Sequence, residues 1–227
     1  MFYFDWTVIL MLPGLLLGIW AQSKVNNAYR TYSRVGTKSG VTASEAARRM
    51  LWQNGAGDVM IEQTGGHLTD HYDPRSNVLR LSSGVCHSGS IAALGIAAHE
   101  AGHAIQQAEN YPFLKLRTWV APVVNIGSSP SWPIFFLGLL FSWQPLMMLG
   151  IWLFAAVVLF TLITLPVEFD ASRRAVRMLQ DGGYVTGEEL TGVQKVLQAA
   201  ALTYVAAAVT SMLSLLRLLI IARNRRD

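Results

Sequence analysis

The sequence predicts a mainly α-helical integral membrane protein with about four transmembrane helices and a soluble part that includes a small antiparallel β-sheet. Of its 227 residues, 52% are apolar and only 14% are charged, whereas about a quarter of the residues of an ordinary soluble domain are charged. The apolar residues are concentrated in four runs, each close to the ~20 residues that a helix needs to cross a bilayer. Polar segments with helix caps and turn signals separate these runs and supply the soluble part.

The first apolar run is predicted to be a retained anchor. The residues before it, which include Asp5, contain no Lys or Arg, and no small-x-small cleavage site of a secretory signal follows it. Asn125, Pro130 and Pro133 interrupt the second run, and Arg217 lies inside the fourth. The predicted spans are residues 6–21, 119–141, 146–166 and 198–221.

These spans divide the chain into five parts. Residues 1–22 form the N-terminal anchor, residues 119–166 a hairpin of two spans, and residues 198–227 the last span with a basic tail. The two soluble segments are residues 23–118 and 167–197.

Capping signals predict where helices begin in the soluble segments. Thr42 and Glu45 form a capping box at the start of a short helix. Thr186 and Glu189 form a second capping box, at the start of the helix that leads into the last span. Pro166 suits the first turn of a helix, so we expect a new helix to begin there.

Three short runs rich in β-forming residues predict the sheet. The pair Gly65-Gly66 and the residues 73–76 separate these runs, which favours an antiparallel meander. The predicted strands are residues 59–64, 67–73 and 77–82. The edge of the last strand is a candidate to pair with an extended peptide.

Residues 88–107 are predicted to form a helix that carries the pentapeptide His99-Glu100-Ala101-Gly102-His103. Its Ala and Gly residues allow close packing against a neighbour. Too few strongly apolar residues precede His99 for a full span, and polar residues follow His103. We therefore place this helix in the soluble part.

The H-E-x-x-H pattern predicts a zinc site. Four residues turn an α-helix by about 400°, so His99 and His103 project from one face, as two imidazoles must in order to bind one Zn²⁺. Glu100 lies about 100° further round, where it can act as a general base toward a zinc-bound water. A structural role alone would bury these polar groups in an Ala-rich helix at a considerable cost in free energy.

A catalytic zinc site needs a third protein ligand. Glu109 stands where the metzincin pattern has its third histidine, which excludes that class. Glu168 follows the third span directly and is the preferred ligand, with stabilisation of a helix N-terminus as the alternative. The candidates for the third zinc ligand are His67, His71, His87, Glu109, Asp170 and Glu168.

Longer stretches resemble a known family. HEAGHAIQ preceded by SIAALGIAA, together with DHYDPRSNVLRLS, LPVEFDASRRAVRML and VLQAAALTYVAAA, is similar to the YugP-type family of bacterial membrane zinc metallopeptidases over nearly the whole chain. A more distant similarity is to the HtpX and CAAX-prenyl protease group of gluzincins. The resemblance implies a zincin-like soluble domain in which His99, His103 and Glu168 bind one zinc ion and Glu100 is the base.

The chain departs from the wider gluzincin group at one position. That group has the pattern E-[YF]-x-A-D, whereas this chain has Glu168-Phe169-Asp170-Ala171-Ser172. Because Ser172 replaces the closing Asp, the ligand-orienting role of that Asp is not carried over. Asp170 is a candidate to orient a histidine ligand instead. The candidates for an oxyanion donor are His71, Tyr72, His87 and Arg173.

Charged residues beside the spans predict the orientation. Lys and Arg follow the first and third spans and precede the second, so we expect both soluble segments to be cytoplasmic, in a multi-pass protein of the plasma or inner membrane. The basic tail, with Arg223, Arg225 and Arg226, disagrees with this orientation if the fourth segment crosses completely. Either the charges beside the soluble segments outweigh those of the tail, or the fourth segment kinks and does not cross. Since the basic residues flank the spans, the net charge of +4 predicts contact with lipid rather than with nucleic acid.

Together these patterns predict a zinc-dependent endopeptidase that cleaves membrane or membrane-proximal proteins. One alternative is a site-2-type intramembrane protease, in which Asp181 of Asp181-Gly182 is the third ligand; however, this dipeptide is typical of a helix-ending turn. The other alternative is a non-catalytic scaffold or chaperone-like factor that binds zinc. Glu100 argues against it, because a structural site needs no base.

Overall fold

The computed structural model describes residues 6–224, in which the chain forms two compact units. The first unit comprises residues 1–21, 116–165 and 203–227, and the second comprises residues 22–115 and 166–202. Asp5, Arg225 and Arg226, used above to predict the anchor and the basic tail, lie outside the described residues.

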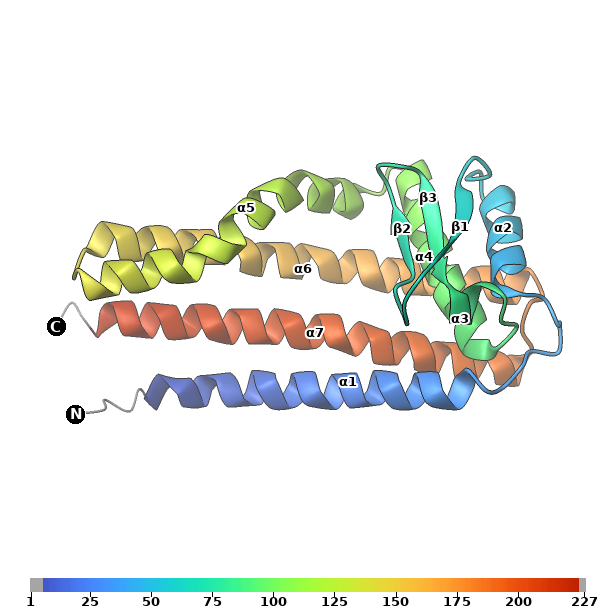
Figure 1. The fold of residues 1–227 in the computed structure, drawn as a ribbon, viewed down its shortest axis with the longest axis horizontal. Coiled ribbons are helices and arrows are strands. Elements are labelled where there is room, and N and C mark those ends of the chain that lie inside the picture. Colours follow the sequence, from blue (N-terminus) through green and yellow to red (C-terminus); the bar gives the residue numbers. More distant parts are fainter. Residues whose placement is uncertain (1–5, 225–227) are drawn as a thin grey trace. The chain divides into compact units, whose positions relative to one another are not determined.

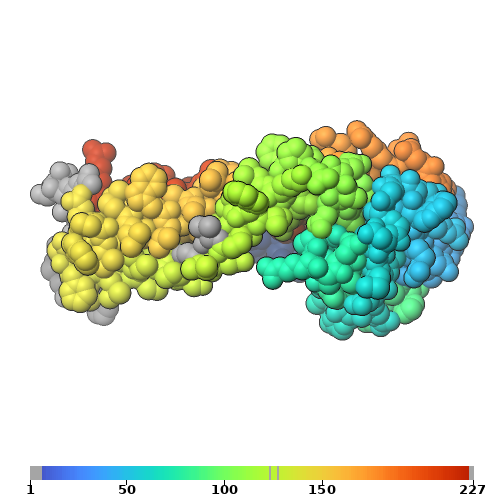
Figure 2. All heavy atoms as spheres, turned by 90° about the horizontal axis from the view of Figure 1, so that it is seen from above, coloured from blue at the N-terminus to red at the C-terminus, as the bar shows by residue number. Residues whose placement is uncertain are grey.

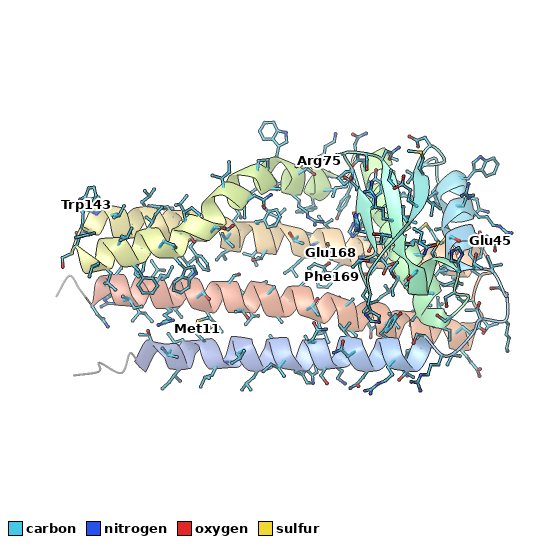
Figure 3. All side chains as sticks on the ribbon, viewed as in Figure 1. Met11, Glu45, Arg75, Trp143, Glu168 and Phe169 are labelled. Carbon is cyan, nitrogen blue, oxygen red and sulfur yellow. The ribbon has the colours of Figure 1, made fainter. Side chains whose placement is uncertain are left out.

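Long helices make up the first unit (Figure 1). A 3-10 helix (Trp6–Met11) leads into α1, and Figure 3 marks this junction at Met11 and the turn between α5 and α6 at Trp143. The helices are α1 (Leu12–Tyr32), α5 (Pro112–Leu140), α6 (Gln144–Asp181) and α7 (Gly187–Arg223), and each of the four extends into the second unit.

Among residues 6–224, three helices are long and apolar enough to cross a membrane: Thr7–Tyr32, α6 and α7. Helix α5 would be a fourth span only as a bent pair, because its two halves meet at 45° around residue 127. It contains Pro122, Pro130 and Pro133, each of which removes a helical hydrogen bond. Helix α7 is one continuous helix of 37 residues, so the kink considered for the fourth segment is not present.

Large apolar side chains point outward from the first unit. Trp119 is 85% exposed, and Leu140, Phe141 and Trp152 are also largely exposed. A smaller cluster centred on Phe135 is buried between the helices. A soluble protein rarely leaves so much apolar area in water, so this surface suits a lipid environment.

Pro166 does not begin a helix, contrary to the prediction. Helix α6 runs through it without a break, from the apolar stretch into the charged stretch of the second unit. A proline inside a helix costs about 3 kcal/mol. Packing on both sides outweighs this cost, because Ile163 and Val167 are both buried.

The second unit packs helices and a small sheet around one core. The capping box of Thr42 and Glu45 is confirmed at the start of α2 (Ala43–Gln53), and Glu189 accepts the amide of Thr186 at 2.6 Å. Helices α2 and α4 (Ile91–Ala108) share the core with α3 (Ser83–Cys86) and the strands. In Figure 2 the cyan atoms of α2 and the teal atoms of the sheet form one continuous surface.

The sheet is mixed, so the predicted antiparallel meander is wrong. Its strands are β1 (Met60–Thr64), β2 (His71–Asp73) and β3 (Val78–Ser82), in the order β1-β3-β2. β3 pairs antiparallel with β2 but parallel with β1. β3 is also the most buried strand, which explains its central position and excludes it as the free edge for a peptide.

The connection after β1 explains the difference. The carboxylate of Asp70 accepts hydrogen bonds from the amide and the hydroxyl of Ser82, at 2.7 and 3.0 Å. These bonds hold Asp70 at the end of β3, where the chain passes from β1 on one side of β3 to β2 on the other. Gly65-Gly66 therefore lies in a crossing loop rather than in a hairpin turn.

Candidate metal centre

Helix α4 presents the two histidines from the middle of the second unit. The Ser90 hydroxyl caps the helix by accepting the amide of Ala93 at 3.2 Å. The helix ends where Asn110 adopts a left-handed backbone, which Asn tolerates better than most residues. Small buried residues, including Ala98 and Ala101, let neighbouring elements approach this helix closely.

A glycine brings α4 and α6 together. A Cβ atom on Gly102 would lie 2.8 Å from the carbonyl oxygen of Ala171 and 3.3 Å from its Cα. Both are backbone atoms of α6, which cannot move aside as a flexible side chain can. The absence of a side chain at Gly102 therefore sets the helix spacing at the point where His99, His103 and Glu168 meet.

The side chains of His99, His103 and Glu168 converge within the second unit. One potential ligand atom from each lies within 4.8 Å of the others. Glu168 Oε2 is 3.2 Å from His99 Nε2 and 3.5 Å from His103 Nε2. The Glu168 side chain is only 2% exposed, and those of His99 and His103 are 13% and 12% exposed. Figure 3 labels Glu168 on α6, and in the sequence it stands two residues after Pro166.

These donors suit zinc. Zinc binds histidine nitrogens and carboxylate oxygens at about 2.0–2.1 Å in tetrahedral geometry, which places neighbouring ligand atoms about 3.3 Å apart. The observed separations of 3.2 and 3.5 Å agree with this spacing. Three protein donors would leave one position for water or substrate, as in catalytic rather than structural zinc sites.

Each histidine has a polar partner on its outer nitrogen. His99 Nδ1 lies 3.1 Å from the hydroxyl of Ser172, and His103 Nδ1 lies 3.1 Å from Gln106 Oε1. Ser172 thus contacts a histidine from the position where the wider gluzincin pattern has Asp. Asp170 does not contact either histidine directly; it accepts a hydrogen bond from Gln106 Nε2 at 2.9 Å.

Glu100 lies beside the converging side chains and contacts the sheet. Its Oε2 accepts the amide of Tyr72 in β2 at 3.1 Å. Burial raises the pKa of Glu100, although the nearby His99 and His103 act in the opposite direction. For His103, burial would lower the pKa, but the hydrogen bond to Glu168 and the charges of Glu100 and Glu168 raise it.

The side chains of the other predicted candidates have different partners. The ring of His67 packs against Tyr29, His71 Nδ1 contacts the carbonyl of Thr69, and His87 contacts Gln63. Among the oxyanion candidates, Tyr72 donates its hydroxyl to Asn77 at 2.8 Å, and Arg173 is exposed. Within residues 6–224, only His99, His103 and Glu168 form a cluster suited to a metal ion.

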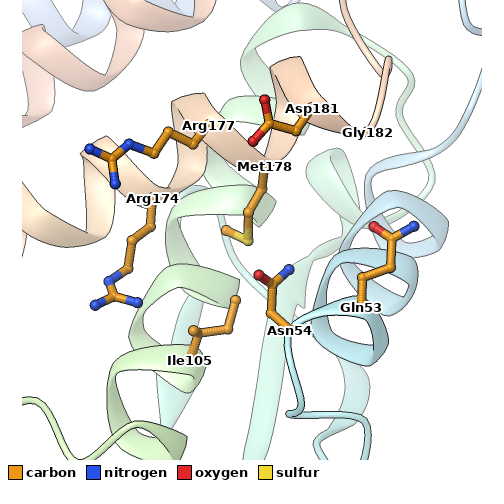
Figure 4. Close-up of a pocket in the computed structure, with 8 residues that line it drawn as sticks. All are labelled: Gln53, Asn54, Ile105, Arg174, Arg177, Met178, Asp181 and Gly182. Atoms are coloured by element: carbon orange, nitrogen blue, oxygen red, sulfur yellow. The ribbon is translucent and has the colours of Figure 1, made fainter.

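A separate pocket of about 440 Å³ lies between α2, α4 and the end of α6 (Figure 4). Arg174, Arg177 and Asp181 line it, together with Ile105 of α4, but none of the three converging side chains does. Asp181 is thus away from the histidines, at the turn that ends α6. This position gives no support to Asp181 as a zinc ligand.

Comparison with known proteins agrees with this geometry. Residues 7–223 match the family described as "Putative neutral zinc metallopeptidase". The chain belongs to this family. Within it, a protein of Bacillus subtilis (strain 168) described as "Putative membrane protease YugP" is 48% identical over 220 residues, which cover 97% of this chain and 98% of the relative. The resemblance to YugP-type zinc metallopeptidases is thereby confirmed, and no solved structure matches.

Sequence reasoning missed two contacts around the three converging side chains, one made by the Gln106 side chain and one by the Tyr72 amide. Gln106 stands three residues after His103 on α4, a spacing that places both on one helix face. That spacing was a usable signal for Gln106. No sequence signal predicted that the Tyr72 amide would contact Glu100, because this contact depends on how β2 packs against α4.

Proposed function

We propose that the protein is a zinc-dependent endopeptidase that cleaves membrane or membrane-proximal proteins. The observation that carries this proposal is the convergence of two imidazoles and a buried carboxylate, with a second carboxylate directly beside them. His99, His103 and Glu168 would hold the ion. Zinc bound there supplies a Lewis acid that polarises a carbonyl group and makes water more acidic.

Glu100 is the general base and then the general acid. Its Oε2 is held by the Tyr72 amide, so Oε1 is the oxygen that takes a proton from the attacking water. The same carboxyl group then passes that proton to the nitrogen of the leaving amine as the peptide bond breaks. Burial raises the pKa of Glu100 in the metal-free protein, whereas a Zn²⁺ ion bound beside it would lower that pKa.

The edge strand β2 is the proposed support for the substrate backbone. It pairs with β3 on one side only, and it contacts α4 through Tyr72 and Glu100. An extended peptide that adds to this edge would lie next to the general base. This assigns to β2 the role that the sequence suggested for residues 77–82.

The proposed location is the plasma or inner membrane, with the second unit in the cytoplasm. The outward-facing apolar surface of the first unit and the Lys and Arg residues beside the spans support this location. The partners are the lipid bilayer and a protein or peptide substrate.

The test is cleavage by the full-length chain in lipid nanodiscs, with an unfolded membrane-protein fragment as the probe. The wild type should cleave it, a chelator should stop cleavage, and added zinc should restore it. Glu100→Gln should slow cleavage by about 10²–10⁴-fold, the usual contribution of a general base, while it keeps one zinc per chain. The matched control is Glu62→Gln, an exposed glutamate of β1 that pairs with Arg80.

Full activity in Glu100→Gln would contradict the mechanism. Zinc binding without any cleavage in the wild type would instead favour the non-catalytic scaffold. Glu100→Gln also serves to trap bound substrates from solubilised membranes, because it should bind them without releasing products.

A further inference from the structure

Gln106 is a buried polar residue that the proposed chemistry does not use. Its side chain is fully buried and makes three polar contacts. Oε1 lies 3.1 Å from His103 Nδ1, while Nε2 lies 2.9 Å from both the carbonyl oxygen of Val167 and Asp170 Oδ2. Gln106 therefore connects α4 with two positions on α6.

The partners of Gln106 determine which way its amide points. A backbone carbonyl oxygen and a carboxylate only accept hydrogen bonds, so the NH₂ group must face Val167 and Asp170. The amide oxygen then faces His103 and can only accept. Nδ1 of His103 must therefore carry a proton, which leaves the lone pair of a neutral ring on Nε2, the atom that faces Glu168.

Asp170 is itself held in place. Its Oδ2 accepts a hydrogen bond from Arg174 Nε at 2.6 Å, and Arg174 Nη1 pairs with Glu109 at 2.7 Å. Arg174 forms part of the wall of the pocket in Figure 4, so the chain of contacts runs from His103 to the surface of the second unit. The chain begins at a metal-facing histidine and ends at an arginine fixed by two carboxylates.

His99 lacks an equivalent constraint. Its Nδ1 faces the Ser172 hydroxyl, which can donate or accept. Ser172 alone thus allows either neutral form of His99, whereas Gln106 allows only one form of His103. The two histidines differ in this respect although they stand on the same helix face.

We propose that Gln106 is a positioning residue that fixes the neutral form of His103 with its free lone pair toward the metal, and that Asp170 and Arg174 fix Gln106. This inference rests on the proposed zinc centre and adds a role for residues outside the ligand set. Loss of such an outer partner typically weakens metal binding by about 10–100-fold.

The test compares Gln106→Met with Gln107→Met in the full-length chain. Gln107 is the adjacent glutamine on α4, and its side chain donates to the carbonyl of Pro74 rather than to the metal centre. Zinc affinity should fall about 10–100-fold in Gln106→Met and stay unchanged in Gln107→Met. Equal affinity of Gln106→Met and the wild type, or an equal loss in both variants, would overturn the proposal.

A spectroscopic measurement separates positioning from folding. In zinc-free wild-type protein labelled with ¹⁵N-histidine, at a pH where the ring is neutral, His103 should show the Nδ1–H form, and Gln106→Met should show a mixture. Asp170→Asn keeps Gln106 but weakens the hydrogen bond that holds its amide. In this variant the zinc affinity and the fraction of His103 in the Nδ1–H form should also fall, but by less than in Gln106→Met. If His103 keeps the Nδ1–H form in both variants, the proposal is wrong.

These readouts do not require a substrate. A wild type that binds zinc but cleaves nothing would refute the proposed peptidase activity and leave the role of Gln106 intact. A Gln106→Met variant with full zinc affinity would refute the role of Gln106 and leave the peptidase activity intact.

Discussion

The two units of the molecule bury polar groups in different ways. In the first unit several buried polar contacts involve small hydroxyl groups, as where Thr161 and Ser211 meet at 3.0 Å between α6 and α7. Each of these hydroxyls also contacts a carbonyl of its own helix, so it is satisfied locally. In the second unit, two histidines of α4 and a glutamate of α6 converge.

This difference indicates where function lies. Hydroxyl contacts within an apolar helix bundle contribute little to stability. A buried carboxylate, in contrast, destabilises the fold by several kcal/mol unless positive or hydrogen-bonding partners offset the loss of its hydration. His99 and His103 offset part of this cost for Glu168, and a bound metal ion would offset more of it. Substitutions in the second unit should therefore alter metal binding, and comparable ones in the first unit should not.

The largest effect is expected for Glu168→Ala. It removes one of three protein ligands, so zinc affinity should fall by more than the roughly 100-fold typical of losing an outer partner. Asp181→Ala is the matched control, an acidic residue of the same helix in the second unit. Zinc titration of both variants is the measurement, and loss of zinc in Asp181→Ala with retention in Glu168→Ala would favour the site-2-type arrangement.

A smaller effect is expected for Gly102→Ala. The added methyl group would meet the backbone of Ala171, and overpacking of this kind costs about 1–3 kcal/mol. Gly95→Ala on the same helix is the control, because its nearest contact would be an ordinary 3.4 Å from Val193. Denaturant unfolding of the zinc-free chain should show Gly102→Ala less stable than the wild type, and Gly95→Ala at least as stable. The reverse order would refute the close approach of α4 and α6.

A still smaller effect is expected in the first unit. Thr161→Val keeps the shape of the side chain but removes the contact with Ser211, and such contacts within membrane helices average about 0.6 kcal/mol. Thermal unfolding should show a slight loss of stability, with unchanged zinc affinity. A large loss of zinc affinity in this variant would refute the functional separation of the two units.

The smallest effect concerns the hairpin of β2 and β3. Hydrogen bonds from Ser76, the Arg75 amide and Arg80 hold the pKa of Asp73 well below its ordinary value of 3.8. Because the folded pKa is lowered, Asp73 stabilises the fold above pH 3.8, and this contribution is lost as the pH falls further. The protection of the β2 amides, taken relative to the intrinsic exchange rate at each pH, should decrease below that pH, and Asp73→Asn should remove this dependence. If the pH dependence of amide protection in β2 is the same in Asp73→Asn as in the wild type, the stabilising role of Asp73 is wrong.

Local patterns predicted the parts that depend on one element alone. Helical spacing placed His99 and His103 together with Glu100 beside them, and the capping box at Thr42 is present. Glu168 was found because a carboxylate directly after an apolar run is unusual. Its convergence with the histidines is consistent with its predicted role as a ligand.

The remaining features depend on contacts between distant segments. The parallel pairing of β1 with β3 needs a connection across the end of β3, where Asp70 contacts Ser82, and turn propensities do not describe such a crossing. The continuous helix through Pro166 depends on packing that outweighs a local preference. The contacts of Gln106 with α6 depend on the rotation of one helix relative to another, which sequence spacing does not fix.

The most direct test of the metal centre is zinc X-ray absorption spectroscopy on the full-length wild type and on Glu100→Gln. The account predicts one zinc per chain in both, bound by two imidazole nitrogens and by oxygen at about 2.0–2.1 Å, with no sulfur ligand. Identical spectra for both chains would support Glu100 as a base that is not a ligand. A sulfur ligand from Cys86, at about 2.3 Å, or a changed ligand set in Glu100→Gln would contradict the account.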